Sequence, residues 1–352
     1  MRIILTAFLL SAAVSATAGQ EPSTKVPGPK STNIFGRESG NQTEVLVAED
    51  VPAEVKKAIE KTLAAAVSTW GSSGRLEYWV LGTDQKAALK LHAKFCERRV
   101  SRGHMSERDC LADRLDKDHG FLMYQSIGAK ALKSGQPRGS AGHNGGAQWG
   151  FHNMTSSLPL GFAGKLGIAG EDEQVTILHE YWHSVQNSFI QTREHERRRK
   201  LMGPVWFIEG SAVAMAEITA ARLWSTGKLR RWKNGRHEWP SLKERMINKM
   251  KTIQSKRKEC PTALPDSYDA PCRELAYEGG AWAIAYLLHR DGLDVLRKKF
   301  HPNVERLGWE TAFKETFGQS SASFASEFEK FLDRPLDEQV RILRFPPSNH
   351  AE

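Results

Sequence analysis

VTILHEYWHSVQ, residues Val175–Gln186, carries His179, Glu180 and His183 in the order H-E-x-x-H. On an α-helix, residues four positions apart lie on one face, one turn from each other. The two imidazoles can therefore bind one metal ion together, and the Glu180 carboxylate then lies beside them, near the position of an attacking water. The stretch predicts a helix that presents a metal site to a cleft.

The sequence around this motif predicts that it is helical. Apolar residues recur at spacings of three and four, which is the pattern of a buried helical stripe. The stripe consists of Val175, Leu178, Trp182, Val185 and Phe189. Three acidic residues at positions 171–173 precede it, where the helix dipole favours anions. A chance match to five letters is the alternative interpretation, and the rest of the chain has to separate the two.

A second motif lies about 25 residues after the first. Gly203–Ala212 reads GPVWFIEGSA, which places Glu209 in an apolar stretch. A carboxylate in such surroundings, if buried, is expected to be paired or bound to a metal. A catalytic zinc takes three protein ligands and keeps one position for water, and two histidines with one glutamate are an established set. Glu209 is therefore the expected third ligand. The alternative is a glutamate near a helix start, stabilised by the dipole.

The two motifs together resemble those of the gluzincin metallopeptidases, in which W-[LF]-x-E-G-x-A follows H-E-x-x-H. In this chain the second motif reads WFIEGSA. The local form HEYWHSVQ resembles the peptidase MA-like branch of that clan. The resemblance implies a zinc ion held by His179, His183 and Glu209, with Glu180 as the general base. It extends over residues 175–332 and is weak before residue 145.

The chain departs from two related patterns. The metzincin arrangement requires a glycine and a third histidine at positions where this chain has Gln186 and Phe189, and His195 lies further on, so that class is excluded. The G-x-M-E-N exopeptidase motif of the gluzincin aminopeptidases is absent from the sequence. An endopeptidase, or a peptidase of unknown specificity, is the interpretation that the resemblance then supports.

A tyrosine further along is a second catalytic candidate. In the gluzincin aminopeptidases, a tyrosine in a Y-x-K-G setting polarises the substrate carbonyl. YEGG, residues Tyr277–Gly280, is similar but has glycine in place of the lysine. The resemblance implies that the Tyr277 hydroxyl stabilises the tetrahedral oxyanion. The alternative is a core tyrosine with its hydroxyl at the surface.

Several other polar residues are weaker candidates. Glu217 lies two turns after Glu209 on the helix expected over 211–223, and it either accepts a hydrogen bond from a ligand histidine or is a plain polar residue. Lone histidines are usually structural or exposed to solvent. The lone histidines considered are His143, His152 and His289.

The N-terminus has the pattern of a secretory signal peptide. A positive start is followed by the apolar run Ile3–Leu10 and by Ala16-Thr17-Ala18, so cleavage is expected after Ala18. The apolar run is too short to span a bilayer, and we expect no membrane span later in the chain. The mature protein is expected to be secreted or periplasmic. Residues 19–44, rich in small and turn-forming residues, are expected to form a mobile arm.

Four cysteines allow three disulfide pairings. We expect Cys96–Cys110 and Cys260–Cys272, because pairing near neighbours closes two short loops. Each bond is worth about 3 kcal/mol in the chain-entropy account. A zinc site made of the four cysteines is the weaker alternative, since no C-x-x-C pair is present.

The positive charge of the chain is concentrated in one segment. Arg222–Glu259 has thirteen basic and three acidic residues, a net charge of +10, whereas the whole chain carries +9. Tryptophans at positions 224, 232 and 239 lie among the basic residues. We favour a solvated helical hairpin. The alternative is weak contact with anionic envelope polymers; no nucleic-acid motif is present, so no nucleic-acid partner is expected.

The predicted fold is α+β and zincin-like, with a metal cleft between two subdomains. Residues 45–170 are expected to form a small sheet with helices, 171–335 a mostly helical gluzincin subdomain, and 336–352 a tail. Strands are expected over Leu76–Leu81, Phe121–Ile127 and Ala147–Thr155. Helices are expected over Val51–Trp70, Asp84–Arg99 and, with a break at Gly318, Trp309–Leu332. Arg102–Asp118 is expected to be irregular, and Gly135–Gly146 to be a glycine-rich loop.

These features predict an exported zinc metallohydrolase, most simply a peptidase with a peptide or protein substrate. Strand addition of an extended peptide to Ala147–Thr155 is a further hypothesis. Two other classes are open. One is a non-catalytic envelope-binding protein that uses the basic segment and a structural zinc. The other is a metal-dependent amidase acting on cell-wall material.

Overall fold

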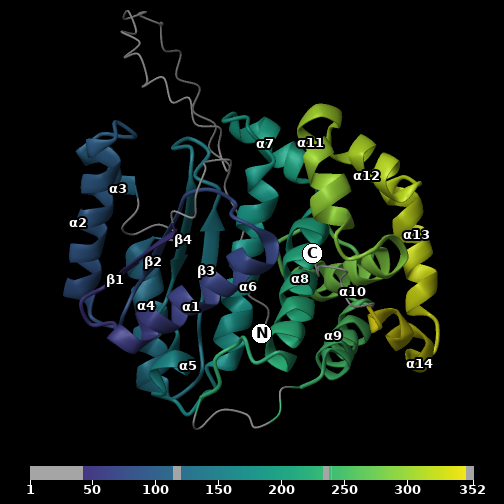
Figure 1. Ribbon diagram of the computed structural model, residues 1–352, viewed down its shortest axis with the longest axis horizontal. Helices are drawn as coiled ribbons and strands as arrows, with labels where there is room; N and C mark the ends of the chain where they lie inside the picture. Colours follow the sequence, from purple (N-terminus) through teal and green to yellow (C-terminus); the bar gives the residue numbers. More distant parts are fainter. Residues whose placement is uncertain (1–42, 114–119, 233–237, 239, 346–352) are drawn as a thin grey trace, which may run out of the picture. The chain divides into compact units, whose positions relative to one another are not determined.

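The computed structural model of this 352-residue chain describes residues 43–113, 120–232, 238 and 240–345 (Figure 1). The predicted signal peptide and nearly all of the predicted arm lie outside the described residues, and so do the last residues of the tail. Within the described part, the fold is α+β, as expected. A small mixed sheet in the N-terminal half is followed by a largely helical C-terminal half.

A four-stranded sheet forms the core of the N-terminal half, in the order β1-β2-β4-β3 (Figure 1). Its strands are β1 (Thr43–Val47), β2 (Leu76–Val80), β3 (Ala141–Asn144) and β4 (His152–Ser156). The first, second and fourth are parallel, and β3 runs antiparallel to β4 at one edge. Every residue of β2 and β4 is buried. Burial of both faces is typical of parallel strands joined by helical crossovers.

Helices connect these strands and lead into the C-terminal half. They are α1 (Ala53–Trp70), α2 (Gln85–Ser101), α3 (Glu107–Asp113), α4 (Phe121–Ser134) and α5 (Leu160–Ala163). The side chain of Asp84 caps α2 by accepting a hydrogen bond from the amide of Ala87 at 2.7 Å. α1 packs against α6 (Glu171–Ser188), and Trp70 stacks on Tyr181 of that helix. The motif helix is thereby held against the sheet layer.

The C-terminal half is built around three helices packed in succession, α6, α8 and α10 (Figure 1). Its elements after α6 are α7 (His195–Met202), α8 (Val205–Ser225), α9 (Leu242–Lys256), α10 (Arg273–Asp291), a π-helical turn (Leu296–Phe300), α11 (His301–Leu307), α12 (Trp309–Phe317), α13 (Ser321–Leu332), α14 (Leu336–Gln339) and a 3₁₀ turn (Val340–Leu343). α8 and α10 touch through their backbones, because a Cβ at Gly280 would lie 2.2 Å from the Trp206 carbonyl oxygen. The predicted helix pair after Trp309 is confirmed, and Gly318 ends its first member in a left-handed conformation.

Several predictions of local structure in the N-terminal half were wrong. The stretch Phe121–Ile127 is the first half of α4 and not a strand. A short apolar run does not distinguish a strand from a buried helix segment, and in this case the helix continues to a left-handed Gly135. The glycine-rich loop contains the edge strand β3, and Ala147–Thr155 is a strand only from His152 onward. The irregular Arg102–Asp118 contains the short helix α3.

The predicted start of the folded region was also slightly late, since β1 begins at Thr43, inside the expected arm. Both expected disulfides are present. Cys96–Cys110 joins α2 to α3, and Cys260–Cys272 closes the loop between α9 and α10. No single helix among the described residues is long and apolar enough to cross a membrane; α7 and α8 reach that length and hydropathy only as a pair, which is bent by 61°.

Candidate metal centre

Helix α6 brings the two histidines of the motif to one face. Its apolar side is fixed in the core by the predicted stripe, of which Leu178, Trp182 and Val185 are buried. The ends of the stripe, at positions 175 and 189, are half-buried. The side chains of His179 and His183 keep 15% and 9% of their exposed surface. The imidazoles therefore lie at the margin of the core and not within it.

The third predicted ligand lies against both imidazoles. Oε2 of Glu209 is 3.3 Å from Nε2 of His179 and 3.5 Å from Nε2 of His183, and the two nitrogens are 3.2 Å apart. A tetrahedral zinc with bonds of about 2.0–2.1 Å separates its ligand atoms by roughly 3.3–3.4 Å. The three donor atoms have the spacing of one face of such a tetrahedron. The residues present therefore fit three of the four ligand positions of a zinc ion.

Helix α8 places Glu209 at this point. Its first amide, that of Val205, donates a 2.8 Å hydrogen bond to Oδ1 of Asp266, which caps the helix start. Glu209 follows one turn later on the side that faces α6, and the residue is only 6% exposed. Gly210 follows the ligand and allows the close approach of α10, since a Cβ there would lie 2.3 Å from the Gly280 backbone. The ligand is thus held between two packed helices.

The electrostatics of the cluster favour a positive charge between its members. Burial alone would raise the pKa of the Glu209 carboxyl, but the imidazoles of His183 and His179 hold it well below its usual range. Burial alone would lower the pKa of His183, but the Glu209 carboxylate outweighs it and raises this pKa to about 9. Either a proton or a metal ion can supply this positive charge, and a divalent ion can interact with all three side chains at once.

Gln186 orients the second histidine, and the sequence reasoning missed this role. Its amide nitrogen donates to the carbonyl of Ile208 at 3.0 Å and to Oγ of Ser211 at 2.7 Å. Its oxygen therefore faces Nδ1 of His183, 2.7 Å away, and accepts a hydrogen bond from it. In the neutral ring, the proton on Nδ1 leaves Nε2 with the free lone pair that a metal needs. The signal was present, because Gln186 is three residues after His183 on the same helix.

Glu180 is buried beside the two imidazoles, with 6% of its surface exposed. Burial raises the pKa of its carboxyl, and the neighbouring His179 and His183 oppose this only in part. A carboxyl whose pKa is raised by burial is better suited to accept a proton and release it again than an ordinary exposed carboxylate. This is the chemistry expected of the glutamate in H-E-x-x-H.

Two tyrosines lie at the carboxylate side of the cluster. The ring of Tyr277 stacks on that of His179, with centroids 6.3 Å apart and planes within 5°. Burial, and then the charge of Glu209, raise the pKa of its hydroxyl above the usual range. The Tyr268 hydroxyl, which sequence reasoning did not single out, donates a 2.9 Å hydrogen bond to Oε1 of Glu209. It comes from the loop closed by Cys260–Cys272.

Glu217 does not serve the histidines. Its carboxylate is only 3% exposed and binds Arg245 through two hydrogen bonds and Lys249 at 3.3 Å. Lys249 also pairs with Glu278, at 3.0 Å. These contacts join α8 to α9 and α10, so Glu217 is a structural ion-pair partner. Of the two alternatives left open for Glu217, neither describes it fully, because two cations of the basic segment, Arg245 and Lys249, turn inward onto its carboxylate.

The remaining histidine candidates divide into two groups. His289 is exposed, and His195 has a side chain that is 88% exposed, away from the cluster. His143 of β3 lies with its ring centroid 6.1 Å from that of His183. Its Nε2 is 3.2 Å from Nδ1 of His152, whose own Nε2 donates to the carbonyl of Ser73 at 2.8 Å. The His143–His152 contact joins β3 to β4, and the ring contact between His143 and His183 connects the edge strand to the motif helix.

The basic segment is packed onto the protein in the part that is described. Trp232 stacks on Phe162 with centroids 5.0 Å apart, and Trp224 is buried. Trp239 lies outside the described residues. Helix α9 turns its apolar residues Met246, Met250 and Ile253 inward. These contacts agree with a packed helical region whose other face is solvated.

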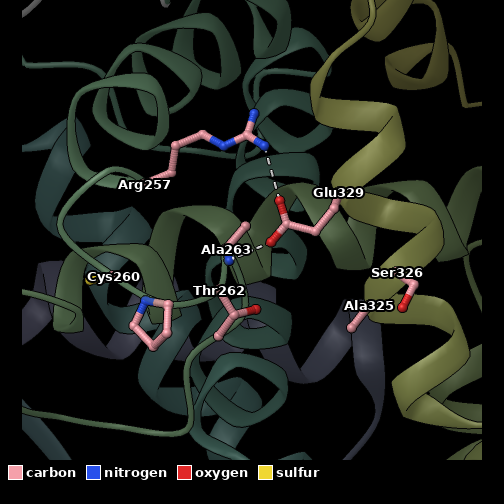
Figure 2. A pocket seen from close by; sticks show the side chains of 8 residues that line it. Arg257, Cys260, Thr262, Ala263, Ala325, Ser326 and Glu329 are labelled. Atoms are coloured by element: carbon pink, nitrogen blue, oxygen red, sulfur yellow. Dashed lines mark hydrogen bonds and ion pairs between the residues drawn. The ribbon is translucent and has the colours of Figure 1, made fainter.

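A separate pocket lies away from these ligands, between α13 and the start of the disulfide-closed loop. Figure 2 shows how Glu329 joins its two walls. Oε2 accepts from Arg257 at 3.0 Å, and Oε1 accepts from the amide of Ala263 at 2.7 Å. These polar groups satisfy each other. The pocket contains none of the predicted site residues.

Comparison with protein-family profiles, with curated proteins and with solved structures found no match for this chain. The functional interpretation therefore depends on the two motifs and on the geometry of the cluster that they form.

Proposed function

We propose that this chain is a zinc-dependent peptidase of the gluzincin type with a zincin-like fold. The observation that carries the proposal is the spacing of three donor atoms from α6 and α8, between 3.2 and 3.5 Å, which fits three corners of a tetrahedral zinc site. The buried Glu180 beside them supplies the proton carrier that hydrolysis requires.

Zinc held by His179, His183 and Glu209 would supply a Lewis acid and lower the pKa of a bound water to about 7. Glu180 takes the proton from the attacking water and delivers it to the leaving amine. Its raised pKa suits both transfers. The Tyr277 hydroxyl, on the ring stacked over His179, donates a hydrogen bond to the developing oxyanion.

The proposed substrate is an extended peptide, but the strand that binds it differs from the one expected. β4, which forms the end of the predicted Ala147–Thr155 strand, pairs with β2 on one side and with β3 on the other. Both sides of β4 are therefore already paired, and a peptide cannot be added to it. Among the described strands, β3 pairs with β4 alone and packs on α6, so its outer edge lies beside the motif helix. A peptide added along this edge would pass the metal ligands.

An oxidising compartment is part of the proposal. Both disulfides close short loops, and such bonds persist in secreted or periplasmic proteins. The peptide substrate is then a protein or peptide outside the cytoplasm.

Metal analysis and a casein digestion assay test the proposal on the mature protein. We expect one zinc per chain, hydrolysis that stops with a chelator, and recovery on adding zinc. Glu180→Gln is expected to keep the zinc and to lose hydrolysis by a factor of 10² or more, as removal of a general base does (~10²–10⁴). Full activity of this variant would refute the mechanism. Zinc without hydrolysis in the wild type, against casein and cell-wall fragments alike, would instead favour a structural metal.

A further inference from the structure

The loop between α9 and α10 is fixed at three places and carries a tyrosine to the metal ligands. The Cys260–Cys272 disulfide closes it. The Ala263 amide binds Glu329 of α13, as seen in Figure 2, and Asp266 accepts from the first amide of α8. The loop is therefore attached to the same helix that supplies the third ligand.

The two oxygens of the Glu209 carboxylate have separate partners. Oε2 faces the two imidazoles, at 3.3 and 3.5 Å. Oε1 accepts a hydrogen bond of 2.9 Å from the hydroxyl of Tyr268, 59 residues further along the chain. Glu209 is 6% exposed, whereas Tyr268 is 51% exposed, so the phenol reaches in from the surface. An exposed tyrosine has little to gain in packing from this position, which makes the hydroxyl contact its clearest contribution.

We propose that Tyr268 is a positioning residue that makes Glu209 a one-oxygen ligand and so preserves the open corner of the metal site. This inference rests on the proposed zinc site. A carboxylate can bind a metal through one oxygen or through both, and the second mode would use the corner that a catalytic site keeps for water. A hydrogen bond from the phenol engages Oε1 and leaves Oε2 alone directed at the imidazoles.

Tyr268 has a different position from Tyr277. The Tyr277 ring lies parallel to the His179 ring, and its hydroxyl interacts with both Glu209 and Arg273. Tyr268 binds a ligand oxygen directly and is fixed by its loop. Partners of this kind typically change metal affinity by about 10–100-fold when they are removed. The two tyrosines therefore predict different phenotypes, the first in turnover and the second in metal binding.

The test compares Tyr268→Phe with Tyr286→Phe in the full-length mature protein. Tyr286 on α10 also donates to a glutamate, Glu327 at 2.6 Å, but with no part in the metal site, so its variant is a matched control. Zinc affinity is measured by competition with a chromogenic chelator. Visible absorption of the Co²⁺ form reports coordination number, since four-coordinate Co²⁺ absorbs more strongly than five- or six-coordinate Co²⁺. Circular dichroism melting checks that both variants fold.

We expect Tyr268→Phe to bind zinc about 10–100-fold more weakly and to give a weaker Co²⁺ absorption, with the control unchanged in both. Wild-type values for Tyr268→Phe in both measurements would overturn the inference. If this variant does not fold, Tyr268→Ala, which also removes the hydroxyl, is expected to show the same loss of affinity; wild-type affinity there would overturn the inference too. A wild-type protein that binds no zinc would refute the proposed function itself, which keeps the two failures distinct.

Discussion

The contact between α8 and α10 provides the sharpest test of how the metal site is held. At Gly280, an added Cβ would lie 2.2 Å from the Trp206 carbonyl oxygen and 2.9 Å from Cα of Gly210. Ordinary contacts of this kind begin at 3.4 Å. In Gly280→Ala the two helices must therefore separate locally by about 1 Å, because a helix backbone has no side chain that can rotate away. Gly210 adjoins Glu209, so the shift reaches the third ligand.

The expected cost combines two opposing effects. Overpacking of a close-packed interior costs about 1–3 kcal/mol, occasionally more. Replacing glycine by alanine inside a helix returns about 1 kcal/mol through helix propensity. We therefore expect Gly280→Ala to be destabilised by up to about 2 kcal/mol and to bind zinc more weakly. Thermal melting by circular dichroism and the chelator competition measure the two effects.

Gly128→Ala is the matched control, because Gly128 also lies inside a helix but its added Cβ would meet nothing closer than 3.3 Å, the carbonyl oxygen of Gly82. That variant is expected to melt within about 1 kcal/mol of the wild type, with unchanged zinc affinity. If Gly280→Ala melts at or above the wild-type temperature and binds zinc normally, then contact between these helices does not position Glu209, and the reasoning that links helix packing to the third ligand is refuted.

Two further predictions concern the histidines. Gln186→Leu removes the oxygen that accepts from Nδ1 of His183, so zinc affinity should fall about 10–100-fold while the fold is retained; equal chelator competition would contradict this. Burial lowers the pKa of His152 and of His301 to about 3 in the folded protein. Their contribution to stability is complete above the unfolded pKa of about 6.5 and is lost as the pH falls toward 3. Between pH 7 and 5, each of the two histidines should lower the free energy of unfolding by about 2 kcal/mol. The loss is measured as a lower urea midpoint at pH 5. His301→Leu should remove about half of the combined loss.

The sequence predicted best where one local pattern was enough to determine the structure. α6 repeats apolar residues at helical spacing over its whole length, and choosing near neighbours among the three possible cysteine pairings gave both disulfides. β3 is different, because Ala141–Asn144 has no β-branched residue and becomes a strand only through its pairing with β4. α4 was missed for a related reason, since its first apolar turn also fits a strand.

The candidate site shows the same division. His179, His183 and Glu209 were predicted from two motifs, because their spacing along two helices is visible in the chain. Gln186 was within reach of the same reasoning, being on the ligand helix. Tyr268 was not, since its hydroxyl meets Glu209 only after a loop from a distant part of the chain has been attached to α8. A contact between residues far apart in the chain produces no repeating pattern in the sequence from which it could be predicted.

The charge of the basic segment could not be interpreted from the sequence alone, because the sequence does not show which carboxylates pair with its cations. Its net charge of +10 suggested a solvated surface or a binding site for anionic polymers. In the fold, several of these cations are bound by carboxylates from other elements. The pairs are Arg245 with Asp172 and Glu217, Lys249 with Glu217 and Glu278, Lys256 with Glu274, and Arg257 with Glu329 and Asp333. Removing one member of the buried pairs at Glu217 would leave a charge unpaired in the interior, at a cost of about 3–5 kcal/mol. Four of the thirteen basic residues of this segment therefore have carboxylate partners on other elements, so the charge of these four has a structural role and is not by itself a sign of an anionic ligand.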